Sequence, residues 1–527
     1  MSPSPESDQT IGGALADRAG SHPGRTFIRF GNERFSYAEI DVLASRVARG
    51  LHDLGCRKGS LIALLLPNCP EYVFLQFGIA RAGMVQVPLS TEAQGPLLAH
   101  FLDNAMPELL ISTPQFLPRI EAVAGDLKRL PRLVLENTVD FEHLVDAPPR
   151  APEVSVAGHD LAAIFYTSGT TGVSKGVMLA QRHNLHLASL IARLAALTPD
   201  DVFYSAFPYY HGVSQYMAVL PAMVAGASAA IAEKFSASGF WDDVRRHGAT
   251  ACWSVMTIPA ALMKQPERPD DADNPLRVMF GMGIDPNIWE AFEQRFNLKF
   301  LNSFGSTETN LIIACPGIGA PVPNRRVSGR ASEDFEVAIV DENDHPLPAG
   351  QTGYIVSRPR LPCTQMLGYY RMPEETVKVT ANLWMHNGDM GYVDEDGWFY
   401  FTGRGKDAMR IGGENVSAQE VEAVMDSHPA VLESAVFALA GDLGEDEIKA
   451  DVRLKADASV SPAEMIAFCR ERMAKHMVPR YLQFRPELPR TGTEKIQKAK
   501  LKEEGLTAET WDSRRKEFLG AGRRVRP

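Results

Sequence analysis

The chain lacks several features that would assign it to a specialised class of protein. Its six cysteines lie far apart and none forms a Cys-x-x-Cys pair, so the pattern suggests neither a zinc site nor a disulfide framework. The longest apolar stretch, residues 217–232, is broken by Pro221 and Gly226 and is too short to span a bilayer, which predicts buried core strands or a core helix. Net charge is -11, which argues against nucleic acid as a partner.

The N-terminal segment also lacks the apolar core of a signal peptide, because MSPSPESDQTIGG is polar and acidic. Together with the unpaired cysteines, this favours a cytoplasmic protein with reduced thiols. The sequence leaves open whether the protein is a monomer or a homodimer. An acidic chain that uses an anionic ligand must concentrate positive charge locally, because its overall field does not attract anions.

What the sequence contains is the ordinary content of a globular protein, with 45% apolar and 23% charged residues. Cores stop growing at roughly 250–300 residues, so 527 residues predict two or more domains. Residues 27–150 alternate between helix-like and strand-like patterns: a hairpin turns at residues 31–32, a helix covers 37–54 and a buried strand covers 61–66. This alternation predicts helices covering a largely parallel sheet.

The pattern changes towards the C-terminus. Beyond about residue 330 there are short strands with turns, at 336–340, 353–356 and 398–402. The last part of the chain predicts helices at 418–426 and 462–473 and strands at 431–440 and 448–454, which together make a small α+β domain. A boundary fits near residues 403–407, and polar loops are expected at 146–152 and 264–275.

The segment with the clearest chemistry is residues 166–176, YTSGTTGVSKG, which follows an apolar strand. Glycines allow backbone N–H groups to turn inward, hydroxyls add donors and Lys175 adds a positive charge, so the loop suits a polyphosphate. It is not a P-loop, because Ser174 precedes the lysine and the spacing differs. The candidate nucleotide-binding residues here are Thr167, Ser168, Gly169, Thr170, Thr171 and Lys175.

With this loop and the segments described below, the chain resembles the adenylate-forming superfamily, which includes acyl-CoA synthetases, peptide-synthetase adenylation domains and luciferases. The resemblance covers about residues 10–505, with the segments in family order. It implies an α/β fold: a large N-terminal domain of layered sheets with a small β-barrel-like subdomain (1–404), a hinge (405–407), and a small mobile α+β domain (408–527) that carries a catalytic lysine loop.

The resemblance assigns roles to residues 302–310, NSFGSTETN. Phe304 would lie against adenine, where the family usually has tyrosine, and Thr307 would bind the α-phosphate. Glu308 would help to hold Mg²⁺, since hard cations prefer carboxylate oxygen, and Thr167 would assist it. Residues 281–284, GMGI, occupy the position of the adenine-binding strand end, where the family usually has GGAP. The other nucleotide-binding candidates here are Gly281, Met282, Asn302, Ser303 and Gly305.

Further positions follow from the same resemblance. Asp389 would accept the ribose hydroxyls, and Arg404 would reach the ribose or a phosphate. Lys406 falls at the hinge, where many relatives have aspartate and some have lysine. The segment RIGGEN lines the thiol tunnel in the family, which assigns coenzyme A binding to Gly412, Gly413 and Glu414.

The adenylation lysine of the family precedes isoleucine near the C-terminus, which points to Lys495 in the segment LPRTGTEKIQKAK. A cation between a carboxylate and the α-phosphate neutralises both charges as they approach. Glu494 stands where glycine is usual, and Lys498 and Lys500 are the nearest rival lysines.

The acyl site is indicated by residues 207–214, FPYYHGVS, in which His211 matches the family residue beside the acyl and pantetheine passages. Peptide-synthetase domains commonly carry an aspartate nearby to hold a substrate amine, and residues 209–217 contain none. This favours a carboxylic acid without an α-amino group. Small residues around 281–283 and 305–306 and an aromatic, methionine-rich stretch at 209–223 favour a medium-sized or bulky hydrophobic acid, including polycyclic ones.

The resemblance thus implies an ATP-dependent acyl-CoA synthetase that uses ATP, Mg²⁺ and coenzyme A. The acid becomes an acyl-adenylate with release of pyrophosphate, and a thiol then takes the acyl group. The alternatives are an adenylation enzyme that loads a carrier protein and a nucleotide-binding sensor without turnover. Some N-terminal stretches also resemble carnitine/crotonobetaine-CoA ligases, whose substrates are small and cationic.

Overall fold

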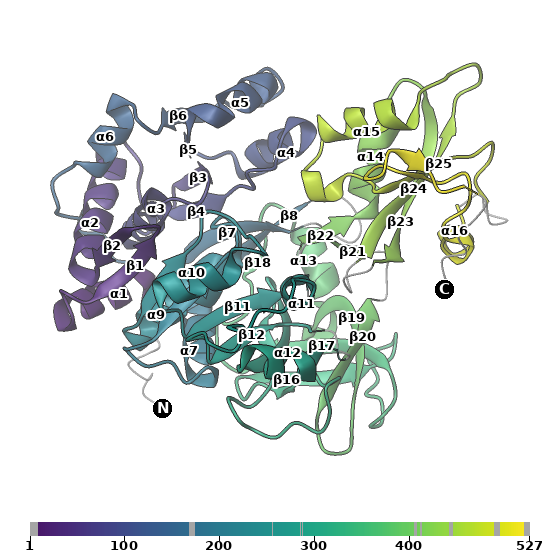
Figure 1. Ribbon diagram of the computed structural model, residues 1–527. Helices are drawn as coiled ribbons and strands as arrows, with labels where there is room; N and C mark the ends of the chain where they lie inside the picture. Colours follow the sequence, from purple (N-terminus) through teal and green to yellow (C-terminus); the bar gives the residue numbers. More distant parts are fainter. Residues whose placement is uncertain are drawn as a thin grey trace.

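The computed structural model describes residues 9–520 except 168–173, 256, 285, 287, 405–407, 412–413, 442–445 and 490–495. Two large sheets form the main body, a four-stranded sheet adjoins them, and residues 408–520, here called the C-terminal unit, extend to one side (Figure 1). No helix in this described part of the chain has both the length and the apolar character required to cross a membrane.

The first large sheet has the strand order β18-β8-β7-β4-β3-β5-β6. Its central strands run parallel, as the sequence predicts, while β7 and β8 form an antiparallel hairpin at one side. Alternate side chains of β3 enter two different apolar cores, one of which lies under α4 (Gly95–Ala105) and α5 (Leu117–Ala124). Because β3 is buried on both faces, its sequence is a continuous apolar run. The strands are β3 (Leu61–Leu65), β4 (Val85–Pro88), β5 (Leu109–Ser112), β6 (Arg132–Leu135), β7 (Leu161–Thr167), β8 (Lys175–Ala180) and β18 (Gly368–Tyr369).

The second large sheet has the order β15-β14-β13-β12-β11-β9-β10-β1-β2. Strands β1, β10, β9, β11, β12 and β13 are parallel neighbours, and antiparallel strands complete both edges. The largest apolar core contacts both sheets. The strands are β1 (Thr26–Phe30), β2 (Glu33–Ser36), β9 (Val202–Ser205), β10 (Ser228–Ile231), β11 (Ala251–Val255), β12 (Val278–Met282), β13 (Lys299–Ser306), β14 (Asn310–Ala314) and β15 (Arg330–Ala331).

Helices of the main body pack closely between and around these sheets. The predicted helix at 37–54 is α2, which begins with a capping box between Ser36 and Glu39. A Cβ on Gly78 of α3 would lie 2.4 Å from Val47, so only glycine permits this α2–α3 contact. The helices are α1 (Ile11–Ser21), α2 (Tyr37–Asp53), α3 (Pro70–Arg81), α4 (Gly95–Ala105), η2 (Pro114–Phe116), α5 (Leu117–Ala124), α6 (Val139–Val145), α7 (Gln181–Leu194), α8 (Gly212–Ser214), η3 (Gln215–Val219), α9 (Leu220–Ala225), α10 (Phe240–His247), α11 (Thr257–Met263), α12 (Trp289–Phe296), α13 (Pro373–Val379) and η4 (Ala381–Leu383).

The β-barrel-like subdomain expected from the sequence corresponds to an antiparallel sheet of β16 (Phe335–Val340), β17 (Gly353–Pro359), β19 (Met385–Val393) and β20 (Phe399–Arg404). A bridge between Gly329 and Phe399 connects it to the chain entering β15. These strands and β14 surround a separate apolar core that includes Ile312, Ile339 and Ile355.

The C-terminal unit has a core of its own, formed largely by β23, β24 and the helices α14 and α15. The predicted helix at 418–426 and strand at 431–440 are confirmed, whereas the helix predicted at 462–473 ends earlier, at Arg470. Its elements are β21 (Ala408–Ile411), β22 (Glu414–Ser417), α14 (Ala418–Asp426), β23 (Val431–Ala440), β24 (Asp446–Leu454), α15 (Pro462–Arg470), η5 (Lys475–Met477), β25 (Tyr481–Phe484), α16 (Lys498–Glu504), β26 (Trp511–Asp512) and β27 (Glu517–Phe518).

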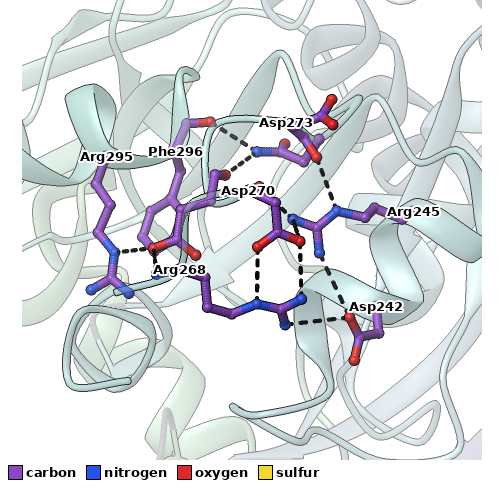
Figure 2. A network of polar contacts seen from close by, with 9 residues as sticks. Asp242, Arg245, Arg268, Asp270, Asp273, Arg295 and Phe296 are labelled. Carbon is purple, nitrogen blue, oxygen red and sulfur yellow. Dashed lines mark hydrogen bonds and ion pairs between the residues drawn. The ribbon is translucent and has the colours of Figure 1, made fainter. Parts of the chain in front are cut away.

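The polar loop at 264–275 is fixed by arginines from neighbouring elements (Figure 2). Arg268 forms two 3.0 Å hydrogen bonds to Asp270, and Arg245 of α10 donates to the carbonyl oxygens of Asp270 and Asp273. Arg295 of α12 donates to Asp271 at 2.7 Å, and both side chains are largely buried. These contacts replace the backbone ladder that the loop lacks, so its charges have a structural role.

Candidate active site

The predicted phosphate-binding segment, residues 166–176, includes the end of β7 and the start of β8, which pair as antiparallel neighbours. Thr167 and Lys175 are the last opposed pair of these two strands before the segment that connects them. Ser168, Gly169, Thr170 and Thr171 lie outside the described residues. Just before Lys175, the carbonyl oxygen of Ser174 lies 2.8 Å from the ring Nε2 of His100 on α4. Two predicted residues, Thr167 and Lys175, are therefore held side by side by strand pairing.

Lys175 is almost fully buried, and its charge is neutralised by a residue that the sequence did not reveal. Its Nζ lies 2.6 Å from a carboxylate oxygen of Glu375 on α13, and 5.0 Å from the centre of the Tyr369 ring. Hydrogen bonds from Lys175 and then Lys378 lower the pKa of Glu375 to about 2, so this carboxylate is ionised at neutral pH. Glu375 therefore balances the positive charge of Lys175 in this structure.

Glu308 connects the two large sheets. It lies in the turn between β13 and β14, and its Oε1 accepts hydrogen bonds from the Thr167 hydroxyl at 3.4 Å and from the Tyr369 hydroxyl at 3.1 Å. Burial, followed by the negative charge of Glu308, raises the pKa of Tyr369. Thr167 and Glu308, separated by 141 positions in the chain, therefore meet, as the metal-binding prediction requires.

The ends of β12 and β13 place a second group of predicted residues together. Gly281 and Asn302 are opposed across the strands, the Asn302 side chain accepts from the Gly283 N–H at 2.9 Å, and Ser303 donates to the Gly281 carbonyl at 2.8 Å. A Cβ on Gly281 would lie 2.4 Å from the carbonyl oxygen of Ser254, which explains glycine at this position. Met282 follows, partly exposed, at the end of β12.

Phe304 and Gly305 continue β13 towards Glu308. The Phe304 ring stacks on Phe401 of β20, with centroids 5.3 Å apart and planes 30° apart. A Cβ on Gly305 would lie 2.1 Å from the carbonyl oxygen of Asn310, so the tight β13–β14 turn requires glycine. Thr307 lies in this turn, partly exposed, beside Glu308.

The four-stranded sheet adds Asp389 and Arg404. Asp389 on β19 is 2% exposed and is opposed to Arg404 on β20. Two positions earlier on β19, the Asn387 side chain donates to the Ser306 hydroxyl at 3.1 Å. This contact joins the strand of Asp389 to the turn of Glu308, so residues from three sheets converge on one region.

Comparison with known proteins identifies the family. A family model described as "AMP-binding enzyme" matches residues 15–370, and one described as "AMP-binding enzyme C-terminal domain" matches residues 420–495. The chain belongs to the AMP-binding enzyme family. It is a member of the adenylate-forming superfamily, of the AMP-forming, acid–thiol ligase type, as the sequence predicts.

Relatives and solved structures agree with this assignment. A crotonobetaine/carnitine–CoA ligase of Salmonella paratyphi B is 34% identical over 517 residues, covering 92% of this chain and 97% of the relative. The amide bond synthetase McbA from Marinactinospora thermotolerans has a TM-score of 0.84 at 22% identity, covering 94% of this chain and 100% of the other. ATP-bound MatB from Rhodopseudomonas palustris has a TM-score of 0.70 at 28% identity, covering 94% and 98%.

In this AMP-binding enzyme, His211 is distant in sequence from both Thr167 and Glu308, but its segment lies near the β7–β8 hairpin. It precedes α8, and its Nδ1 accepts a hydrogen bond from the Val213 N–H at 3.2 Å. A Cβ on the next residue, Gly212, would lie 3.7 Å from both Phe165 of β7 and Tyr216. The segment with His211 therefore packs on the strand that leads to Thr167.

The remaining predicted residues of this AMP-binding enzyme cannot be placed in the same way. Lys406, Gly412, Gly413 and Lys495 lie outside the described residues, and Glu414 begins β22. The rival Lys498 forms a 2.6 Å ion pair with Glu422 inside the C-terminal unit. Sequence reasoning missed Tyr369, Glu375 and Asn387, because each acts through a partner distant in the chain and none belongs to a recognisable local pattern.

Proposed function

We propose that the enzyme activates a carboxylic acid with Mg-ATP and transfers the acyl group to the thiol of coenzyme A. This proposal rests on one observation, the hydrogen bond from the Thr167 hydroxyl to the Glu308 carboxylate. Thr167 directly precedes the glycine-, serine- and threonine-rich segment, and Glu308 lies in the β13–β14 turn of the other large sheet. A loop that suits phosphates and a carboxylate that suits a hard cation are thereby placed at one point.

In the first half-reaction, a carboxylate oxygen of the acid attacks the α-phosphorus of ATP, and the bond to pyrophosphate breaks. Thr307 and Lys495 stabilise the charge that develops on the α-phosphate, while residues 168–171 and Lys175 hold the β- and γ-phosphates. Adenine would bind against Asn302, Ser303 and the backbone of residues 281–283. Phe304 would lie against the base, and Asp389 and Arg404 would hold the ribose.

Magnesium fits the residues present. No group of three His, Cys, Asp or Glu side chains in the described part of the chain is arranged to chelate a metal ion, so a cation at Glu308 would complete its shell with phosphate oxygens and water. Such an ion, held by Glu308 and Thr167, would neutralise phosphate charge. The Glu308 carboxylate already faces two hydroxyl donors, which orient it for this role.

Adenylation requires a second arrangement of the C-terminal unit. We divide the chain into an N-terminal domain (1–404), a hinge (405–407) and a mobile C-terminal domain (408–527), with Lys406 absorbing the rotation. After adenylation, the rotation withdraws Lys495 and presents Gly412, Gly413 and Glu414 to the pantetheine arm. The thiolate attacks the acyl carbon and the bond to AMP breaks, with His211 beside the passage.

The proposed acid is medium-sized or bulky and hydrophobic. Residues 206–232 contain no acidic side chain that would pair with a substrate cation. Phe207, Tyr210, Met217 and Met282 are only partly buried and supply apolar surface around this segment and the end of β12. The relative from Salmonella acts on crotonobetaine or carnitine by name, so a small cationic acid is the alternative.

A panel experiment tests this function. Aromatic, polycyclic, medium-chain aliphatic and betaine acids are incubated with ATP, Mg²⁺ and coenzyme A, and the acyl-CoA, AMP and pyrophosphate formed are measured. We expect one hydrophobic class to yield all three products in equal amounts. Pyrophosphate without a thioester would indicate a carrier-loading enzyme, turnover of betaines alone would overturn the substrate class, and no acid-dependent pyrophosphate from any acid would contradict the function.

A further inference from the structure

We propose that residues 94–97, here called the docking turn, hold the C-terminal unit in the arrangement of the structure, and that this arrangement serves thiol transfer and excludes adenylation. Gln94 and Leu97 are thus positioning residues for the second half-reaction. The inference rests on the proposed function, because it assigns the contact to one of its two steps.

The polar part of the contact is made by Gln94, which precedes α4. Its Nε2 donates to the carbonyl oxygen of Arg470, and also to that of Met473 at 3.2 Å. These carbonyls lie at and just beyond the end of α15, and the last carbonyls of a helix have no donor within the helix. Figure 1 shows α4 beside α15. The amide of Gln94 therefore supplies donors that the end of α15 needs.

The apolar part is made by Leu97, which packs both against the core under α4 and α5 and against the core of the C-terminal unit. Between these two residues, the backbone itself comes close: a Cβ placed on Gly95 would lie 3.7 Å from the Cα atom of Arg472. The docking turn therefore makes polar, apolar and backbone contacts with the C-terminal unit, and its polar and backbone contacts lie at the end of α15.

The docking turn is held in place by its own domain. The Ala93 N–H donates to the Ser90 carbonyl at 3.0 Å, and Arg119 of α5 donates to the carbonyl oxygen of Thr91 at 2.5 Å. A surface that is already ordered loses little conformational entropy when its partner docks. The turn therefore acts as a preformed receptor for the end of α15.

The docked arrangement keeps the segments that flank the adenylation loop within the C-terminal unit. On either side of the segment that contains Lys495, the Gln497 N–H donates to the Pro489 carbonyl at 2.7 Å, and Ile496 packs against a cluster with Phe437 and Leu488. Figure 1 shows α16, which follows this segment, at the outer edge of the C-terminal unit and far from β7 and β8. For Lys495 to reach a phosphate beside Thr167, the unit must leave Gln94.

The first test separates the two half-reactions. Gln94→Glu keeps the shape of the side chain but removes both donors, whereas Gln115→Glu makes the same change at an exposed position of the same domain. We expect Gln94→Glu to keep acid-dependent ATP–pyrophosphate exchange within about twofold of wild type. Transfer of the acyl group from supplied acyl-adenylate to coenzyme A should slow about fivefold or more, because each lost hydrogen bond is worth about 0.5–1.5 kcal/mol. Equal effects on both steps, or none on either, overturn the proposal.

The second test locks the contact. A Cβ on Gly95 would lie 3.7 Å from the Cα atom of Arg472, so we use Gly95→Cys with Arg472→Cys as the pair of cysteines to be joined by oxidation, and formation of the disulfide is first verified by non-reducing electrophoresis after proteolysis. Exchange of ATP with pyrophosphate needs no thiol, so the disulfide persists during the assay. We expect the oxidised double variant to lose this exchange and to regain it with dithiothreitol, while each single variant keeps it. Exchange by the oxidised form at the reduced rate overturns the proposal, and absence of exchange in wild type would instead remove the proposed function.

Discussion

At the scale of single residues, the site is controlled by partners that the sequence does not mark. Lys175 was predicted from the hairpin motif, but its ion pair with Glu375 joins positions 200 residues apart. Nothing in the sequence around Glu375 distinguishes it from an exposed acid at the start of a short helix. Its function is visible only because β18 and α13 return the chain to the β7–β8 hairpin.

The ion pair yields a prediction about ATP. Glu375→Gln releases Lys175 and removes a negative charge beside the phosphate loop, so we expect the KM for ATP to fall about two- to fivefold, in line with the modest strength of partly exposed ion pairs. Steady-state kinetics at saturating acid measure this change. Glu374→Gln, at the exposed neighbouring position, is the control. We expect Lys175→Ala to raise the KM for ATP, and a rise of the same kind in Glu375→Gln would contradict the prediction by showing that the pair is needed intact.

At the scale of helices and strands, the sequence predicted an element well wherever its apolar residues kept a single spacing, either helical or strand-like. The helix at 37–54 and the boundaries of α14 and β23 were predicted from sequence, because these elements have apolar residues at a regular spacing. Residues 217–232 were predicted as buried core strands or a core helix, and they contain both, since they form part of a π-helix, then α9 and β10. Pro221 explains the difficulty, since it has no N–H to continue a regular α-helical ladder.

Helix α7 carries the clearest pH dependence. Burial lowers the pKa of His183 to about 4, and the 2% exposed ring remains neutral in the folded protein. The unfolded chain binds a proton below about pH 6.5 while the folded chain does not, so stability is complete above that pH and falls as the pH decreases towards 4. At about 1.4 kcal/mol per pKa unit, the loss is of the order of 2–3 kcal/mol.

Chemical denaturation at pH 7 and pH 4.5 measures this slope, with His183→Gln as the matched variant. We expect the variant to show a smaller loss of unfolding free energy than wild type over this interval. It will retain part of the loss, because burial also lowers the pKa of His247 to about 4. Equal slopes for the two proteins would contradict the assignment to His183.

At the scale of the whole molecule, the sequence predicted the α/β class, and the family model and structural neighbours confirm it. It also named Thr167 and Glu308, although no local pattern indicated that they touch. Contacts between distant segments depend on how complete sheets pack, and neither period nor propensity encodes that. The Gln94–α15 contact is of the same kind, because it depends on how the C-terminal unit sits against α4.

One distant lysine, Lys495, is proposed to complete the site on which Thr167 and Glu308 converge. Acid-dependent ATP–pyrophosphate exchange by Lys495→Ala tests it most directly, with Lys500→Ala as the control, since that side chain is exposed on α16. The account predicts that Lys495→Ala loses about 10²–10³-fold in exchange while transfer from supplied acyl-adenylate to the thiol continues, and that Lys500→Ala retains both activities. Exchange by Lys495→Ala at the wild-type rate would contradict it.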